Sequence, residues 1–297
     1  MIQNLYLYIK METLSCSPKT SVDKVQTCYS LSQLKKIAKN YNNSHKDKIN
    51  LNLGKKALWE TLMKKNFDTC ANKEYCWLKQ NYMKLNTNIS NYKDNFRPEK
   101  PKEWENEPNK WLNTYNILDV MKQYEDKYKK FKFIGVFPID FRTKIGNTCV
   151  SPEMCSIDVK ELIKKDKKKL GFVFNLDKHW QSGSHWTSLY INLDNKTKNY
   201  GAYYYDSVGN KPPPEVVDFI KIIKKQISKL DLKNNNKKFT FTYNNIEHQK
   251  GGSECGMFSI YFLDKCLRNV GFSNFINNKK LNDDLVFNYR DKYFVKS

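Results

Sequence analysis

The sequence predicts an α+β fold in which a mixed β-sheet is flanked by helices, behind a helical N-terminal region. Early segments carry apolar residues at helical spacing, whereas later ones are rich in the aromatic and β-branched residues typical of strands. Between them, residues 91–110 carry three prolines and dense charge without periodicity. We therefore expect a helical arm and linker at residues 1–110 and a core domain at residues 111–297.

Each element follows from its local pattern. The segment 212–230 begins with three prolines, which suit the first turn of a helix, and its apolar residues then recur at helical spacing. Helices are expected at residues 31–41, 56–67, 111–128, 212–230 and 255–267. Strands are expected at residues 131–141, 170–176, 185–193, 200–207 and 238–246.

The composition limits the class of protein. The formal net charge is +21, which attracts polyanions such as nucleic acid non-specifically, unless the lysines spread along the chain only coat a solvated surface. No apolar run approaches the roughly 18 residues of a membrane span, so membrane insertion is not expected. Residues 1–16 also lack the pattern of a signal peptide.

Eight cysteines occur without a secretory signal, and most are expected to be free thiols in a reducing compartment. No Cys-x-x-Cys pair is present, and the pairs 70/76 and 149/155 enclose five residues each, which is poor spacing for zinc. We therefore expect no metal site. Cys266 follows the helical pattern after Cys255 and is interpreted as a small buried apolar residue.

One cysteine has a suggestive context. Residues 248–263 read HQKGGSECGMFSIYFL, which places Cys255 at the start of an apolar helix. Unpaired backbone N–H groups there favour a thiolate, the form of cysteine that attacks carbonyl groups. The alternative is a loop that merely caps the helix. The choice depends on whether the chain supplies a base.

Four histidines are available as that base. His45 lies in a polar stretch, and His248 is close to Cys255 in sequence, which does not imply closeness in space. His179 and His185 each precede a tryptophan. His185 opens an expected strand that would hold its ring rigidly, whereas His179 precedes a Gly/Ser loop and is expected to be exposed. We therefore favour His185.

Two further residues complete a candidate catalytic set. Asp206 ends an expected strand and is either a turn former or the carboxylate that orients His185. Gln249 lies six positions before Cys255, and its amide together with the Cys255 N–H could stabilise an oxyanion. Three nearby glycines would let backbone approach a substrate closely: Gly251, Gly252 and Gly256.

These motifs carry a family resemblance. The segments HW at 185–186, YYYDS at 203–207 and QKGGSECG at 249–256 resemble the signature of the Ulp1-type SUMO proteases and the adenovirus protease. WLNTYNI, from residue 111, resembles the start of a helix in that family. The basic arm resembles that of the polyprotein-processing, SUMO-1-like proteases of African swine fever virus and other giant DNA viruses.

The resemblance implies an Ulp1-like cysteine protease core, a circularly permuted relative of the papain fold. It makes Cys255 the nucleophile, His185 the base, Asp206 its orienter and Gln249 the oxyanion donor. Trp111 and Trp186 would clamp a di-glycine substrate, unless they are ordinary core residues.

The implied activity is a cofactor-independent endopeptidase that cleaves after Gly-Gly and matures viral polyproteins in the virion and the host cytoplasm. Isopeptidase activity on ubiquitin-like conjugates is the variant with the same chemistry. Two alternatives belong to other classes, namely an acetyltransferase of the same fold and a basic nucleic-acid-binding protein.

Overall fold

A computed structural model describes residues 15–20, 27–84, 90–230 and 237–295. The chain forms two compact units, one of residues 1–102 with 290–297 and one of residues 103–289. No signal peptide is expected at the N-terminus, and residues 1–14 of that segment lie outside the described residues. None of the described helices combines the length and the apolar character that a membrane span requires.

This division differs from the boundary expected at residue 110. Residues 103–110 group with the second unit, and the C-terminal residues group with the first. A parallel bridge pairs Glu99 with Val295, and an ion pair of 2.5 Å joins Lys100 to Asp291. These contacts between residues almost two hundred positions apart leave no local sequence pattern, so the return of the C-terminus could not be predicted.

The first unit is helical, as expected. Ser30 caps its longest helix by accepting a hydrogen bond from the backbone of Gln33, whose side chain bonds the Ser30 backbone in return. The expected helix at 56–67 breaks near Asn66, and a further short helix follows. The helices are α2 (Leu31–Ser44), α3 (Lys55–Lys65), α4 (Phe67–Cys70), α5 (Glu74–Trp77), α6 (Asn81–Lys84), α7 (Ser90–Lys93) and α15 (Arg290–Tyr293).

The expectation that most cysteines are free thiols is wrong. Disulfides join Cys16 to Cys28, Cys70 to Cys76 and Cys149 to Cys155, and only Cys255 and Cys266 are free. The Cα atoms of the partners lie 5.3, 5.5 and 6.5 Å apart, within the range that a disulfide spans. Free thiols therefore give no reason to place the protein in a reducing compartment.

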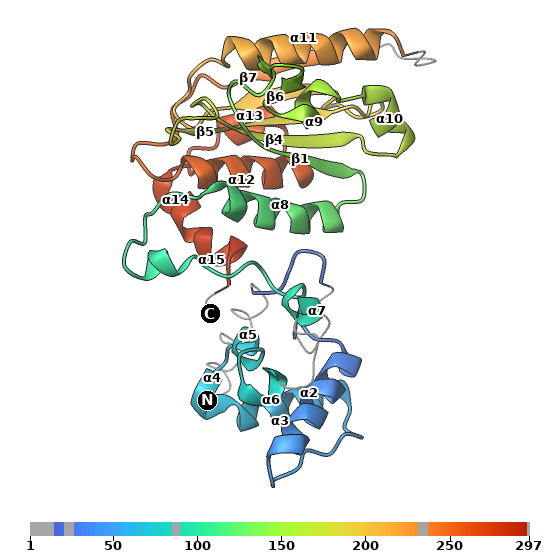
Figure 1. Cartoon of the computed structure of the whole chain (residues 1–297), viewed down its shortest axis with the longest axis vertical. Helices are drawn as coiled ribbons and strands as arrows, with labels where there is room; N and C mark the ends of the chain where they lie inside the picture. Colours follow the sequence, from blue (N-terminus) through green and yellow to red (C-terminus); the bar gives the residue numbers. More distant parts are fainter. Residues whose placement is uncertain (1–14, 21–26, 85–89, 231–236, 296–297) are drawn as a thin grey trace. The chain divides into compact units, whose positions relative to one another are not determined.

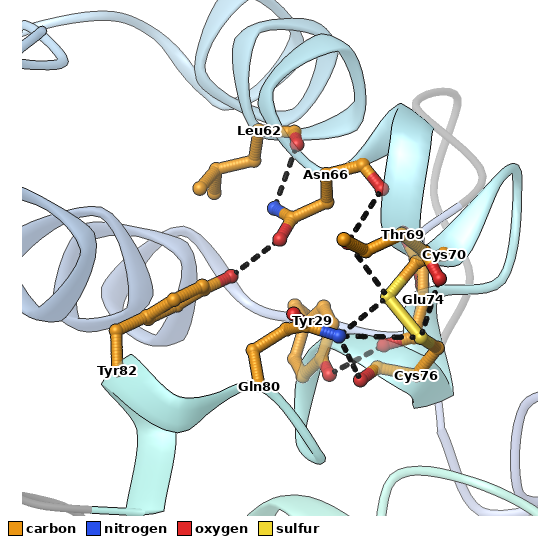
Figure 2. The surroundings of a disulfide bond; sticks show 9 residues. All are labelled: Tyr29, Leu62, Asn66, Thr69, Cys70, Glu74, Cys76, Gln80 and Tyr82. Atoms are coloured by element: carbon orange, nitrogen blue, oxygen red, sulfur yellow. Dashed lines mark hydrogen bonds between the residues drawn. A yellow bond between two sulfur atoms is a disulfide. The ribbon is translucent and has the colours of Figure 1, made fainter. Parts of the chain in front are cut away.

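The disulfide between Cys70 and Cys76 closes a loop that is also tied by polar side chains. Figure 2 shows the Gln80 amide beside both sulfur atoms, with Nε2 3.0 Å from Cys70 Sγ and 3.5 Å from Cys76 Sγ. Inside the loop, the Glu74 carbonyl accepts a hydrogen bond of 3.1 Å from the Tyr29 hydroxyl. Tyr29 stacks on Trp77, so the loop is anchored to the core of the unit.

Glu74 also brings a carboxyl group into that core. Burial raises its pKa, and hydrogen bonds from Thr27, the Cys28 backbone and Trp59 lower it, which leaves it at about 6. A carboxyl group whose pKa is higher in the folded state stabilises the fold below its unfolded pKa and loses that contribution as pH rises through the folded pKa.

We expect the free energy of unfolding to fall by about 2 kcal/mol between pH 4 and 7 on account of Glu74. The measurement is the pH dependence of chemical unfolding for the wild type and for Glu74→Gln, which cannot titrate. The difference between the two proteins isolates this group. Parallel pH profiles would contradict the prediction.

The second unit is built on one mixed sheet of five strands in the order β1-β4-β5-β6-β7. The outer pairs β1/β4 and β6/β7 are parallel, and the inner pairs are antiparallel. All five expected strands are present; one is shifted by a residue and the others are shorter than expected, most of all the last. They are β1 (Phe131–Pro138), β4 (Lys169–Asn175), β5 (Trp186–Asn192), β6 (Gly201–Tyr205) and β7 (Thr240–Tyr243). A small hairpin of β2 (Lys144–Ile145) and β3 (Thr148–Cys149) lies outside this sheet.

Helices cover both faces of the sheet (Figure 1). One face carries α11 (Pro214–Ser228), and the other carries α8 (Thr114–Lys127) and α12 (Cys255–Leu267). Strand β5 is buried along its whole length because it has helices on both sides. The smaller helices are α9 (Pro152–Cys155), α10 (Val159–Lys164), α13 (Phe272–Ile276) and α14 (Asp283–Asn288), with a 3₁₀ turn η1 (Lys102–Glu105) in the expected linker.

Candidate active site

The sheet brings His185 and Asp206 together. His185 immediately precedes β5, Asp206 immediately follows β6, and these two strands are antiparallel neighbours. The start of one therefore lies beside the end of the other, and His185 Nε2 is 2.7 Å from Asp206 Oδ1. Asp206 has no exposed surface, whereas the His185 side chain is 17% exposed. The pair thus has a buried carboxylate and a histidine ring that solvent can reach.

The surroundings of His185 favour its charged form. Burial lowers the pKa of the imidazole, but hydrogen bonds to Asp206 and to Cys255 raise it by a larger amount, so the pKa lies at about 9. Since Nε2 faces Asp206, Nδ1 is the ring nitrogen left for the cysteine. The ring therefore lies between a carboxylate and a thiol, an arrangement that can hold an imidazolium beside a thiolate.

Cys255 is the first residue of α12 and is 2% exposed. The helix is buried along almost its whole length, which fixes the position of its N-terminus. Its free backbone N–H groups supply partial positive charge to the sulfur. The other free thiol, Cys266, is also buried, and burial raises its pKa well above the usual range, as suits an unreactive core residue.

Gln249 is buried in the loop between β7 and α12. Its side-chain oxygen accepts a hydrogen bond of 2.7 Å from the Ser207 hydroxyl, and its Nε2 donates to the Gly251 carbonyl at 2.7 Å. An amide nitrogen carries two hydrogens, so one remains for an oxyanion. Because Ser207 follows Asp206 directly, the segment that carries the carboxylate also orients this amide.

The loop that contains Gly251 and Gly252 is held in place by a residue of a neighbouring helix. Asp283, at the start of α14, accepts hydrogen bonds from the backbone N–H groups of Lys250 and Gly251 at 2.8 and 3.0 Å. The Gly251 carbonyl in turn accepts the hydrogen bond from the Gln249 amide. A side chain at Gly252 would meet nothing within 4 Å, so that position is open toward solvent. Asp283 therefore supports the position of Gln249.

We expect Asp283→Ala to lower kcat by about tenfold with little change in KM, because a looser Gln249 would stabilise an oxyanion less well. The test is steady-state cleavage of a peptide substrate. Asp284→Ala is the matched control, since this neighbour on the same helix is exposed. Equal kcat values for the two variants would count against a supporting role for Asp283.

Both candidate tryptophans line one cavity of about 560 Å³. Trp111 is 44% exposed and Trp186 is 7% exposed. The Trp186 indole N–H donates a hydrogen bond of 2.9 Å to the carbonyl of Leu112, the residue after Trp111, so the two segments are fixed against each other. Gly256 packs beside them, because a Cβ there would lie 3.0 Å from Leu112 and 3.2 Å from Trp186.

The remaining histidines have other settings. His45 is half-buried and stacks on Tyr41, so it is less exposed than its polar segment suggests. His248 is buried between the Tyr205 hydroxyl and the Ile276 carbonyl, and burial lowers its pKa. His179 is exposed, as expected, but it contacts the buried carboxylate of Asp140. In the described part of the chain, no group of three or more histidine, cysteine or acidic residues could hold a metal ion.

Several residues that hold the site in place could not be recognised from the sequence. Asn244 accepts a hydrogen bond of 2.9 Å from the Asp206 backbone N–H and donates one of 2.7 Å to its carbonyl. Asn244 and Asp283 are polar residues at the ends of elements, a weak signal shared by many surface positions. Ser207 lies within the motif at 203–207, but nothing in its sequence context indicates that it orients Gln249.

Comparison with known proteins identifies a family and several relatives. Residues 155–297 match the sequence model of the Ulp1 protease family, C-terminal catalytic domain. A protein of Acanthamoeba polyphaga mimivirus, provisionally named a thiol protease, is 28% identical over 302 residues, which cover 94% of this chain and 92% of the relative. A cysteine protease of African swine fever virus is 25% identical over 191 residues, or 62% of this chain and 67% of the relative.

Solved structures show the same fold. The crystal structure of the selenomethionine form of the ASFV pS273R protease superposes with a TM-score of 0.65 at 20% identity, covering 97% of this chain and all of that one, 100%. The native crystal form gives a TM-score of 0.62 at 18% identity, covering 95% and 96%. The four candidate catalytic residues all fall inside the segment that matches the family. Residues 155–297 therefore carry an Ulp1-family catalytic domain, and the homologues of the chain include viral proteins named thiol protease and cysteine protease.

Proposed function

We propose that the chain is a cysteine endopeptidase that cleaves after the second glycine of Gly-Gly sequences. The observation that carries the proposal is the position of His185. One of its ring nitrogens bonds the buried Asp206, and hydrogen bonds to Asp206 and Cys255 raise the pKa of the ring. A base oriented by a carboxylate beside a nucleophile at a helix N-terminus is the arrangement that acyl transfer requires.

In the proposed reaction the Cys255 thiolate attacks the carbonyl carbon of the second glycine. The oxyanion that develops is stabilised by the Gln249 amide and the Cys255 backbone N–H. The His185 imidazolium gives its proton to the leaving amine as the C–N bond breaks, which leaves an acyl thioester. His185 then takes a proton from water, the resulting hydroxide attacks the thioester, and Cys255 leaves as thiolate while His185 keeps the proton.

The preference for glycine is supported by the two tryptophans. Trp111 and Trp186 line the same cavity, and the hydrogen bond from Trp186 to Leu112 holds them in a fixed relation. A slot between two indole faces leaves no room for a Cβ in the residues that pass through it. Gly256 allows this close packing, since any larger residue would meet Leu112 and Trp186.

The proposed substrates are viral structural polyproteins, processed in the virion and in the cytoplasm of infected cells. The viral relatives support this setting, because they are proteases of large DNA viruses that match much of the chain. Hydrolysis of ubiquitin-like conjugates is the second candidate, favoured by relatives that are named SUMO-1 cysteine proteases. The family match favours both over acetyl transfer. Binding of nucleic acid through the basic surface stays a prediction.

The test is cleavage of a Gly-Gly-x peptide series, read by mass spectrometry. We expect a break after the second glycine, and a loss of about 10- to 100-fold in kcat/KM when either glycine becomes alanine. A SUMO conjugate assayed in parallel separates the two candidate substrates, since far more efficient cleavage of the conjugate would reverse their order. Equal cleavage of Gly-Gly and Ala-Ala peptides would refute the narrow slot.

A further inference from the structure

A second histidine–carboxylate pair lies in the wall of the tryptophan-lined cavity. His179 Nδ1 is 2.7 Å from Asp140 Oδ2, and the His179 backbone N–H donates to Asp140 Oδ1 at 2.9 Å. Asp140 is 6% exposed, and its neighbour Ile139 bonds the carbonyl of Asp177 at 3.0 Å. One carboxylate thus fixes both the backbone and the ring of His179, which lines the cavity together with Trp111 and Trp186.

This geometry determines what the other ring nitrogen can do. A carboxylate can only accept hydrogen bonds, so Nδ1 carries the hydrogen and Nε2 of the neutral ring is an acceptor. The His179 ring packs edge-on against Trp180, with the ring centres 4.6 Å apart, and the His179 side chain is 32% exposed. Among the described residues, none is a hydrogen-bond partner of Nε2. The nearby acid Asp177 is already engaged, since its two oxygens accept from Gly183 and Ser184.

We propose that His179, held by Asp140, determines specificity by accepting a hydrogen bond from the substrate segment that precedes the two glycines. The inference rests on the proposed function. Suppose that the two glycines of the substrate lie between Trp111 and Trp186 and that the scissile bond lies at Cys255. The substrate residues that precede the glycines then extend away from the cysteine into this cavity. The hydrogen-bond donor is either a backbone N–H or a side-chain N–H or O–H of that segment.

Two sets of peptides distinguish these sources. One set replaces single backbone amides before Gly-Gly with N-methyl amides, and the other replaces single donor side chains with alanine. We expect one such change to lower kcat/KM of the wild type by about three- to tenfold and to have no effect in His179→Ala. The set in which this change occurs identifies the donor.

Asp140→Asn provides a sharper test. The new amide would accept from the His179 backbone through its oxygen and donate to Nδ1 through its nitrogen, so the ring would move its hydrogen to Nε2. The acceptor becomes a donor with little change in shape. We expect this variant to lose the wild-type preference although it retains histidine at 179. His45→Ala is the matched histidine control and should keep the preference.

The outcomes separate this inference from the proposed function. If His179→Ala and the wild type respond alike to every peptide change, the inference fails, whatever the variant does to thermal stability. If both variants are stably folded and both lose the same peptide preference, it is supported. If the wild type cleaves no Gly-Gly peptide, the proposed function fails, and this inference fails with it.

Discussion

Replacing either Cys255 or His185 with alanine is expected to lower kcat/KM on a Gly-Gly peptide by about ten thousandfold or more. Without the sulfur no acyl intermediate can form, and without the ring nothing protonates the leaving amine. The two groups act as one unit, so the double variant should be no worse than either single variant. Initial rates at high enzyme concentration, followed by mass spectrometry, measure losses of this size.

The protein offers a matched control for the cysteine. Cys266 is the other free thiol, lies on the same helix and is also buried. Cys266→Ala removes the same atom from a core position and should retain nearly full activity. An inactive Cys266→Ala protein beside an active Cys255→Ala protein would exchange the two roles and refute the proposed site.

The sequence predicted the elements of the second unit because their signals are local. Alternating or continuous apolar runs mark β4, β5 and β6, and helical spacing marks α11 and α12. The candidate site could be predicted for the same reason, since His185, Asp206 and Cys255 each lie at the end of such an element. Their convergence then follows from antiparallel pairing of β5 with β6 and from the packing of α12 on β5.

What could not be predicted depends on contacts between distant residues. The disulfides require Cα atoms that lie close together, a property that cysteine spacing alone does not reveal. Asp283 supports a loop 32 residues earlier in the chain, and Asn244 holds the backbone of Asp206, 38 residues away. Asp140 and His179 are 39 residues apart. Polar residues of this kind are common on surfaces, so only the fold distinguishes those that hold a site.

The pH dependence of cleavage should depend on Asp206. The pKa of His185 is lowered by burial but raised more strongly by its bonds to Asp206 and Cys255, to about 9. We therefore expect wild-type kcat/KM to fall on the alkaline side with an apparent pKa near that value, as the imidazolium is lost. A cysteine–histidine pair titrates as a unit, so the apparent pKa of the alkaline limb belongs to the pair and not to His185 alone.

Asp206→Ala is expected to lower kcat/KM by about 100- to 1000-fold and to move the alkaline limb toward lower pH, because both the acceptor and the negative charge are lost. Asp206→Asn keeps an oxygen that can accept from Nε2 and loses only the charge, so its activity loss should be smaller and its limb should lie between the other two. The measurement is kcat/KM from pH 6 to 10 for the three proteins.

Stability provides an independent check on the same residue. A histidine whose pKa rises from 6.5 to about 9 on folding stabilises the protein fully below the lower value, and that contribution disappears as pH increases through the higher one. The wild type should therefore lose stability between these values relative to Asp206→Asn. If the alkaline limb and the unfolding profile are unchanged in both variants, Asp206 only shapes the turn after β6, and His185 must obtain its charge from Cys255 alone.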